Sequence, residues 1–330
     1  MSKPFAKTAL AACMLLVTPA VRAAVPGASS YVQSGLIAQW DGIDNTGTGT
    51  HDPDATVWKD LKGSCDLPCT VGTDVEWGSN YVHILSALVK TAAPAGFDSY
   101  SSVSLEARGW RTNALASNNG YFSTPRVSLS TVTTMARLAV IVYDGTLAWR
   151  GAYVGDNTAG NPDSVNHGTR SCVYTVQSGV SSANGNRPDY YFNGVPESYS
   201  AYENWTTTRA ADFPVSAARG ACLNSVRVYN RALSAGEVAL NANLDRIRFE
   251  GADPGALAWP DGYKCENGKI YFKVEATSSG GSTVTLNGES SGTTVFFWSE
   301  LGSPTNVTVS ATLPAGTVLH GWSGAPPDAV

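Results

Sequence analysis

The residues of this chain that could do chemistry begin with a loop rich in side-chain oxygens. Calcium takes six to eight oxygen ligands from carboxylates, amides and carbonyls. The segment after Trp40 offers Asp41, Asp44, Asn45, Asp52 and Asp54, although without EF-hand spacing. Asp and Asn also cap turns by hydrogen-bonding their own backbone. We favour this second interpretation, and calcium remains a candidate cofactor.

Aromatic residues beside polar ones form a second set of candidates. A sugar ring can stack its apolar face on an exposed aromatic ring while neighbouring Arg, Asn or Asp side chains supply hydrogen bonds. The chain has 9 Trp and 14 Tyr, more than a small core needs. The rings with polar neighbours, at which we predict ligand contacts, are Trp110, Trp149, Tyr153 and Trp205. The competing role of each ring is packing in the core or between strands.

Catalytic motifs are missing from the sequence. Hydrolysis of a glycosidic bond needs a pair of carboxylates, and no Glu-x-Asp-x-Glu triplet places acids on one strand face. The isolated acids are predicted to be surface charges: Glu76, Glu106, Glu197 and Glu203. No phosphate loop, dinucleotide fingerprint or zinc-protease helix motif occurs. The Gly321–Gly324 run lacks the spacing of a nucleophile elbow. We therefore predict no catalytic residues and no enzymatic activity.

Elements that could position these residues are clearest near residue 230. Alternation over 224–229 predicts a half-buried strand, with Val226 and Val228 on one face. Ser234 and Glu237 have capping-box spacing, which predicts that a helix starts there. Leu233 and Val238 are placed for a hydrophobic staple across that helix start. Short strand-like runs separated by turn residues fill the chain before this helix, so we predict an all-β fold with one late helix.

Four short motifs in order along the chain carry a family resemblance. They are Gly35–Asp41, Val57–Gly63 ("W-x-D-x-x-G"), Tyr190–Val195 ("Y-x-N-G-V") and Val226–Val238 ("VRVYNRALSAGEV"). Together they resemble laminin G-like, concanavalin A-like jelly-roll domains of bacterial secreted and surface proteins, over residues 31–250. The resemblance implies a sandwich of two antiparallel sheets, often a binding module with calcium at a rim loop. It also implies that Trp40 and Trp58 are buried and that Asp60 is structural.

The composition changes after Phe249. Residues 251–262 are rich in Gly, Pro and Asp and are predicted to be a linker. A second series of strands follows over 263–330. Residues 308–324 resemble the end of a small all-β repeat module of bacterial surface proteins, with its G-W-S-G signature. Because such a module should continue beyond Val330, we expect the module to be incomplete and the chain to be a fragment of a longer protein.

The N-terminal residues are typical of a cleavable export signal. Basic Lys3 and Lys7 precede an apolar run that is too short to span a bilayer, and Ala23 offers a cleavage site. A lipoprotein signal ending at Cys13 is the weaker alternative. We predict a signal peptide over 1–23 and a mature protein that is secreted or at the cell surface, without membrane insertion. A net charge of −5 with scattered basic residues gives no nucleic-acid footprint.

Export makes disulfides the default state of the remaining cysteines. We predict a local bridge between Cys65 and Cys69 and a bridge between Cys172 and Cys222 that joins distant strands; Cys265 is left unpaired or pairs elsewhere. The sequence does not fix the connectivity. A cysteine-rich metal site has little support, because no C-x-x-C pair occurs and the His residues lie far from the Cys.

These observations favour a non-catalytic module that binds a glycan or another surface protein. One alternative is a structural spacer of a larger adhesin. A second alternative is a polysaccharide-active glycoside hydrolase with an unrecognised site.

Overall fold

The computed structural model describes most of the chain between residues 25 and 312. The described ranges are 25–90, 102–111, 121–124, 127–132, 137–144, 147–154, 172–178, 189–196, 201–205, 215–278, 283–287, 289–290, 293–301 and 307–312. The predicted signal peptide and the G-W-S-G run therefore lie outside the described residues. Among the described helices, none has the length and apolar character needed to cross a membrane.

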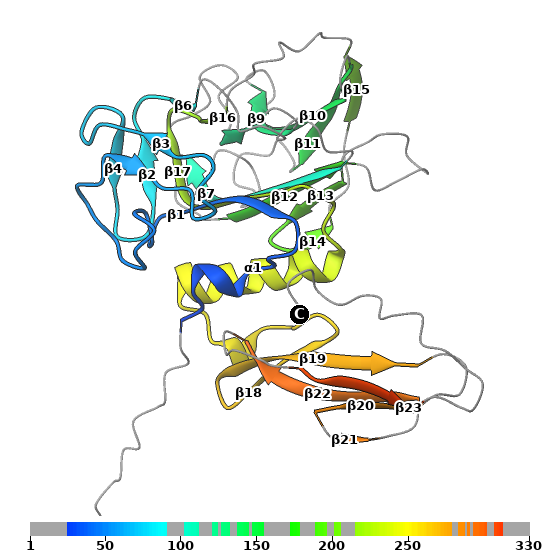
Figure 1. Cartoon of the computed structure of the whole chain (residues 1–330). Coiled ribbons are helices and arrows are strands. Elements are labelled where there is room, and N and C mark those ends of the chain that lie inside the picture. The colour runs from blue at the N-terminus through cyan, green and yellow to red at the C-terminus, as the bar shows by residue number, and fades with distance from the viewer. Residues whose placement is uncertain are drawn as a thin grey trace, which may run out of the picture.

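Two antiparallel sheets form the main body of the protein (Figure 1). The eight-stranded sheet contains, in spatial order, β14 (Val195–Pro196), β13 (Asp189–Phe192), β12 (Cys172–Ser178), β7 (Val103–Arg111), β17 (Ala221–Tyr229), β5 (Val82–Ile84) and β4 (Val75–Trp77), with β1 (Leu36–Asp41) also paired to β17. The seven-stranded sheet contains β15 (Ala201–Trp205), β11 (Leu147–Val154), β10 (Arg137–Asp144), β9 (Val127–Val132), β8 (Phe122–Ser123), β16 (Val215–Ala217) and β6 (Leu88–Lys90). A short ribbon of β2 (Val57–Trp58) and β3 (Leu67–Pro68) lies beside them.

The core lies between the two sheets. Leu105 of β7 and Val226 of β17 belong to the same buried cluster as Phe122 of β8 and Leu129 of β9. Trp40 also belongs to it, and its ring centroid lies 5.0 Å from that of Phe122. The predicted all-β fold of two antiparallel sheets with one α-helix is therefore confirmed, as is the burial of Trp40 and Trp58.

The closing strand and helix form where the sequence predicts them. Ser234 caps α1 (Ala235–Glu250) with both hydrogen bonds of the capping box, and Gly251 ends it in the left-handed conformation. Leu233 and Val238 are buried in one cluster, as the staple predicts. One expectation is wrong: β17 is buried along its whole length rather than half-buried, because α1 covers its second face.

Loss of the cap should weaken this helix. Replacement of Ser234 with Ala removes the acceptor for the Glu237 amide, 3.3 Å away. We expect the free energy of unfolding to fall by about 1 kcal/mol. Urea denaturation of the variant measures this. An unchanged midpoint would mean that tertiary packing alone holds the helix start.

Between α1 and the eight-stranded sheet, the outer face of the sheet carries a buried ion network. Arg227 donates through Nε to Glu106 Oε2 at 2.9 Å and through Nη2 to Asp245 Oδ2 at 2.8 Å, and all three side chains are fully buried. Its guanidinium also lies 4.1 Å from the ring centroid of Tyr31, whose hydroxyl donates to Asp245. The prediction that Glu106 is a surface charge is therefore wrong. Glu76 is exposed as predicted, while Glu197 and the Glu203 side chain lie outside the described part.

Two of the motif turns have clear physical roles. In the "Y-x-N-G-V" hairpin, Asn193 and Gly194 link β13 to β14 with φ of 49° and 84°, the positive values of a tight hairpin turn. In the "W-x-D-x-x-G" turn, the buried Asp60 carboxylate accepts from the amides of Gln39, Lys62, Ser64 and Cys65. Asp60 is thus structural, as the resemblance implies.

A smaller all-β unit follows α1. One sheet consists of β18 (Tyr263–Glu266), β19 (Lys269–Thr277) and β22 (Thr294–Glu300); the other consists of β21 (Glu289–Ser290), β20 (Thr283–Leu286) and β23 (Val309–Thr312). Leu257 and Ile270 join a buried cluster with Leu240, Leu244 and Ile247 of α1. The segment predicted as a linker includes the 3₁₀ turn Pro254–Ala256, and Ala258 O accepts from Asn243 of α1. Instead of a free tether, the segment packs on the helix, which lies between the two β units (Figure 1).

Candidate functional site: the loop after the first strand

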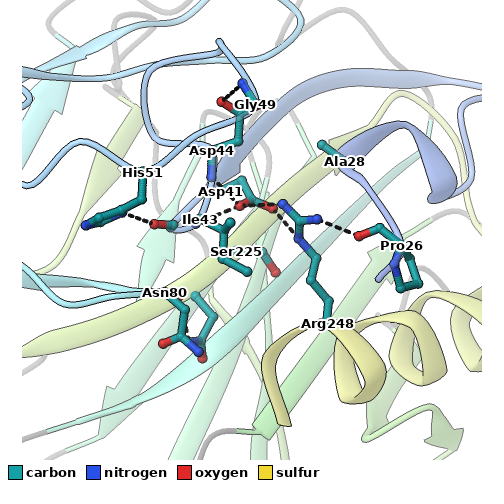
Figure 2. Close-up of polar contacts among 12 residues, drawn as sticks. Pro26, Ala28, Asp41, Ile43, Asp44, Gly49, His51, Asn80, Ser225 and Arg248 are labelled. Atoms are coloured by element: carbon teal, nitrogen blue, oxygen red, sulfur yellow. Dashed lines mark hydrogen bonds and ion pairs between the residues drawn. The ribbon is translucent and has the colours of Figure 1, made fainter. Parts of the chain in front are cut away.

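The oxygen-rich loop leaves the end of β1 and is anchored at its base by an ion pair with α1 (Figure 2). Arg248 donates through Nε to Asp41 Oδ2 and through Nη2 to Asp41 Oδ1, both at 3.1 Å. Its Nη1 donates to the Pro26 carbonyl. The Asp41 side chain is fully buried and that of Arg248 is 7% exposed. This two-pronged geometry fixes both groups in direction as well as distance.

The Asp41 carboxylate also organises the first turn of the loop. Its Oδ1 accepts from the amides of Ile43 and Asp44 at 2.8 and 2.9 Å. Burial alone would lower the pKa of Arg248, but the attraction and hydrogen bonds of Asp41 outweigh it and raise that pKa. Arg248 therefore stays protonated and keeps its charge beside the buried Asp41 side chain.

Further up, the loop is closed by hydrogen bonds between its own residues. Asp44 Oδ1 accepts from the Gly49 amide at 2.8 Å. Asn45 and Asp52 clasp each other, with Asn45 Nδ2 donating to Asp52 O at 2.7 Å and the Asp52 amide donating to Asn45 Oδ1 at 2.9 Å. His51 Nδ1 lies 2.8 Å from Gly42 O, which closes the loop onto its first residue.

This geometry supports turn capping, the interpretation that we favour, and calcium binding by these residues stays a prediction. Asp41 is neutralised by Arg248, while Asp44 and Asn45 use their oxygens on backbone amides. Asp52 Oδ1 accepts from the Asp54 amide at 2.9 Å. Across the described ranges, no group of three or more His, Cys, Asp or Glu side chains has the geometry to hold a metal ion. The alternative interpretation, turn capping, accounts for four of the five predicted ligands, and the Asp54 side chain is exposed.

At the tip, the loop presents a row of hydroxyl groups. Thr46 Oγ1 lies 2.8 Å from Thr48 Oγ1, which lies 3.1 Å from Thr50 Oγ1. The intervening Gly47 and Gly49 have φ of 76° and 84°, which only glycine adopts without strain. The T-G-T-G-T alternation thus brings three hydroxyls into contact with one another, and Thr46 Oγ1 also donates to the Thr50 carbonyl at 3.4 Å. The alternation is visible in the sequence, but contact among its hydroxyls is not predicted by it. No sequence pattern identifies Arg248 as the ion-pair partner of Asp41.

The predicted aromatic ligand residues are divided between the two sheets. Trp110 lies on β7, half-buried, with its ring centroid 4.8 Å from that of Tyr81. Trp149 and Tyr153 lie on β11 and Trp205 on the paired strand β15, in the other sheet. The side chains of these three residues lie outside the described part, so their ligand contacts stay a prediction.

The cysteines do not follow the predicted pairing. Cys65 and Cys69 are buried free thiols, and burial raises their pKa values to about 12 and about 11. Cys172 lies opposite Gly109 on one side of β7, and Cys222 lies opposite Trp110 on the other side. Two strand spacings, about 9.6 Å, exceed the Cα separation of about 7 Å that a disulfide tolerates. The register therefore argues against the predicted Cys172–Cys222 bridge.

Comparisons with known proteins give only distant structural likenesses. No family model and no curated protein sequence matches the chain, so the laminin G-like resemblance stays a prediction. Trypanosoma rangeli sialidase is similar at 15% identity and a TM-score of 0.41, over 68% of this chain and 34% of the sialidase. The botulinum neurotoxin type G receptor-binding domain is similar at 12% identity and a TM-score of 0.42, over 64% of this chain and 52% of that chain.

A third likeness is to domain 4 of AbnA, a GH43 extracellular arabinanase from Geobacillus stearothermophilus, in complex with arabinotriose. It has 13% identity and a TM-score of 0.37, over 62% of this chain and 97% of that domain. The chain spans about a third of the length of the sialidase. Sequence identities and TM-scores this low show nothing about the activity or the sites of this chain.

Proposed function

We propose that the chain is a non-catalytic binding module of an exported protein and that it recognises a glycan through the loop of residues 42–56. The observation that carries the proposal is the hydroxyl row of Thr46, Thr48 and Thr50 on a loop with a fixed base. Each hydroxyl can both donate and accept a hydrogen bond. A row of such groups complements the hydroxyls of a sugar chain.

The fixed base matters energetically. Ordering a flexible side chain on binding costs about 0.5–1.5 kcal/mol. Here the Asp41–Arg248 pair, the hydrogen bonds between Asn45 and Asp52 and the Asp44–Gly49 bond hold the loop through contacts within the chain itself. The hydroxyl row is therefore presented without that cost, and weak individual hydrogen bonds can add up to measurable affinity.

Removing two hydroxyls should weaken recognition without unfolding the protein. We expect the Thr48→Val, Thr50→Val double variant to bind at least about tenfold more weakly, because two lost hydrogen bonds at about 1 kcal/mol each exceed one decade of affinity. Glycan-array screening of the wild type identifies the ligand, and calorimetric titration compares the variants.

The matched control is Thr73→Val, at an exposed threonine in another turn. It should bind as the wild type does, with equal affinity in calcium and in EDTA. Equal binding by the double variant, or a requirement for calcium, would contradict the proposal.

A second candidate function, a structural spacer of a larger surface protein, has its own support. The cluster shared by α1, Leu257 and Ile270 ties the small β unit to the large one, as a stiff stalk requires. A spacer predicts a blank glycan array from a fully folded protein. The neighbouring carboxylates Glu106 and Asp245 are both fully buried against Arg227, so this pair does not favour hydrolytic activity.

A further inference from the structure

The sheet of β18, β19 and β22 in the small β unit has an outer face that the core does not use. Val295 and Phe297 of β22 pack in one buried cluster with Val284 of β20. Successive residues of a strand alternate between the two faces of its sheet. Phe296 and Trp298 therefore lie on the opposite face, away from that cluster.

The strand register places a third ring on the same outer face. Directly opposed residues of an antiparallel pair share a face. Trp298 is opposed to Lys273 of β19, and Tyr271 precedes Lys273 by two residues, on the same side of the strand. Tyr271 is in turn opposed to Lys264 of β18. The rings of Tyr271, Trp298 and Phe296 therefore share one face across two neighbouring strands.

The flat faces of these rings are turned toward solvent. Lys264 Nζ lies over the Trp298 ring, 4.8 Å from its centroid, and over the Tyr271 ring at 5.5 Å. Lys273 Nζ lies over the Phe296 ring at 4.7 Å. The two lysine side chains are 37% and 33% exposed, and Phe296 is 55% exposed. Because a cation–π contact is weak at an exposed site, a ligand can displace the lysines from the rings.

The charged side chains around the rings balance one another. Each of three lysines pairs with a glutamate of the same face: Lys264 with Glu266, Lys269 with Glu300 and Lys273 with Glu275. All six side chains are between 33% and 59% exposed. The pairs contribute no net charge, so they favour neither an anionic nor a cationic ligand. They do place ammonium donors and carboxylate acceptors beside the rings, and hydroxyl groups can bond to both.

We propose that this outer face binds a neutral β-1,4-linked polysaccharide chain, with its sugar units stacked on Tyr271, Trp298 and Phe296. Such sugar units carry C–H groups on their flat faces and hydroxyls around their edges, which match the aromatic rings and the Lys–Glu pairs respectively. Phe296 and Trp298 are two residues apart along β22, about 6.8 Å, so consecutive sugar units can lie on consecutive rings. A protein partner fits this face less well, because the cores of protein interfaces are depleted of Lys and Glu.

This site is separate from the loop of residues 42–56, and the inference does not depend on glycan binding there. The test is calorimetric titration of the intact chain with cellohexaose and with the hexamer of N-acetylglucosamine, two neutral β-1,4-linked chains. We expect at least one of them to bind. The glucosamine hexamer has the same linkage but carries ammonium groups at pH 6, and it should bind more weakly, because the carboxylates of the face are already paired.

Variants of the rings show whether binding uses this face. Trp298→Leu keeps an apolar side chain without the ring and should bind the hexamer about tenfold more weakly, as expected when the apolar face of one sugar unit loses its cover. Trp298→Phe restores a ring and should recover most of the affinity. Val307→Ser, at another exposed apolar residue of the small unit, is the matched control and should bind as the wild type does.

Phe296→Ser covers the case in which Trp298→Leu does not fold. Its side chain is mostly exposed, so its loss leaves the core intact, and binding should weaken by about threefold or more. The Thr48→Val, Thr50→Val variant should keep the binding that depends on Trp298. Hexamer binding that is lost in this threonine variant but normal in Trp298→Leu would assign the glycan to the loop alone and overturn the inference.

Three other results would also overturn it: no binding of either neutral hexamer, tighter binding of the glucosamine hexamer, or equal affinities in the wild type and both ring variants. Sedimentation of the free protein tests a second copy of the chain as the occupant of the face. A dimer that Phe296→Ser converts to a monomer, without hexamer binding, would make the face a self-association surface instead.

Discussion

Replacement of Arg227 with Met is expected to lower the free energy of unfolding by about 3–5 kcal/mol, the cost of breaking a buried ion pair from one side. Arg227 is the only cation that contacts both Glu106 and Asp245 within the described residues, and none of the three side chains touches solvent. Without it, the carboxylates of Glu106 and Asp245 remain buried between the sheet and α1 with no counter-charge. Urea denaturation followed by circular dichroism measures the loss.

The effect should depend on pH in a defined direction. Burial raises the pKa of Glu106, while the Arg227 guanidinium opposes the rise. A carboxyl whose pKa is higher in the folded than in the unfolded state costs stability as pH rises through that window. Removal of Arg227 leaves the rise unopposed. The deficit of the Met variant should therefore be largest at neutral pH and shrink on acidification, as Glu106 binds a proton.

A surface arginine of α1 provides the control for the Arg227 variant. Arg246 lies 3.7 Å from Glu250, and its side chain is 46% exposed. Solvent screens such a pair, so Arg246→Met should change stability by less than about 0.5 kcal/mol. Equal losses in the Arg227 and Arg246 variants would contradict the buried network, as would a deficit that grows on acidification.

The second large effect is expected from Asp41→Asn, which leaves Arg248 without its counter-charge. We expect a loss of about 3 kcal/mol, together with loss of the fixed base of the loop. The amide keeps one oxygen acceptor, whereas the carboxylate accepts from Arg248 and from the amides of Ile43 and Asp44. Glycan affinity should therefore fall with stability, even at a temperature at which the variant is folded.

The matched control for this variant is Asp54→Asn, at an exposed carboxylate of the same loop. It makes the same chemical change without the buried partner, so stability and glycan affinity should both match the wild type. If Asp41→Asn loses stability but binds the glycan normally, the anchor serves the fold alone and the loop is not the binding surface.

Local signals in the sequence were sufficient for much of the fold. The capping box of Ser234 and Glu237 and the turn at Asn193–Gly194 depend on neighbours within a few residues, and both occur as the patterns indicate. The order of the motifs also predicted the two antiparallel sheets. These features need no knowledge of which distant segments meet.

The buried ion pairs could not be predicted, because each one joins residues that are far apart in the sequence. Arg227 and Glu106 are 121 positions apart, and Asp41 and Arg248 are 207 apart. A lone Glu in an alternating strand is predicted to face solvent, and Glu106 does face away from the sandwich core. The structure adds a helix over that face, which turns a predicted surface charge into a buried one. The sequence also does not give the strand register, so it did not reveal that β7 lies between the strands of Cys172 and Cys222.

The loop of residues 42–56 combines features that the sequence predicts with features that it does not. The sequence leaves its acids open as calcium ligands or turn caps, because both roles use the same oxygens. Turn capping is favoured by Arg248, which neutralises Asp41 from 207 positions further along the chain. The hydroxyl row depends on the positive φ of Gly47 and Gly49, which the sequence permits without requiring.

Hydrogen–deuterium exchange of the protein, with and without the glycan selected on the array, tests the central claim most directly. The glycan should slow exchange at the amides of residues 46–54 and leave the peptides of β11 and β15 unchanged. Protection confined to β11 and β15, which carry Trp149 and Trp205, with no change in the loop, would contradict recognition by the hydroxyl row.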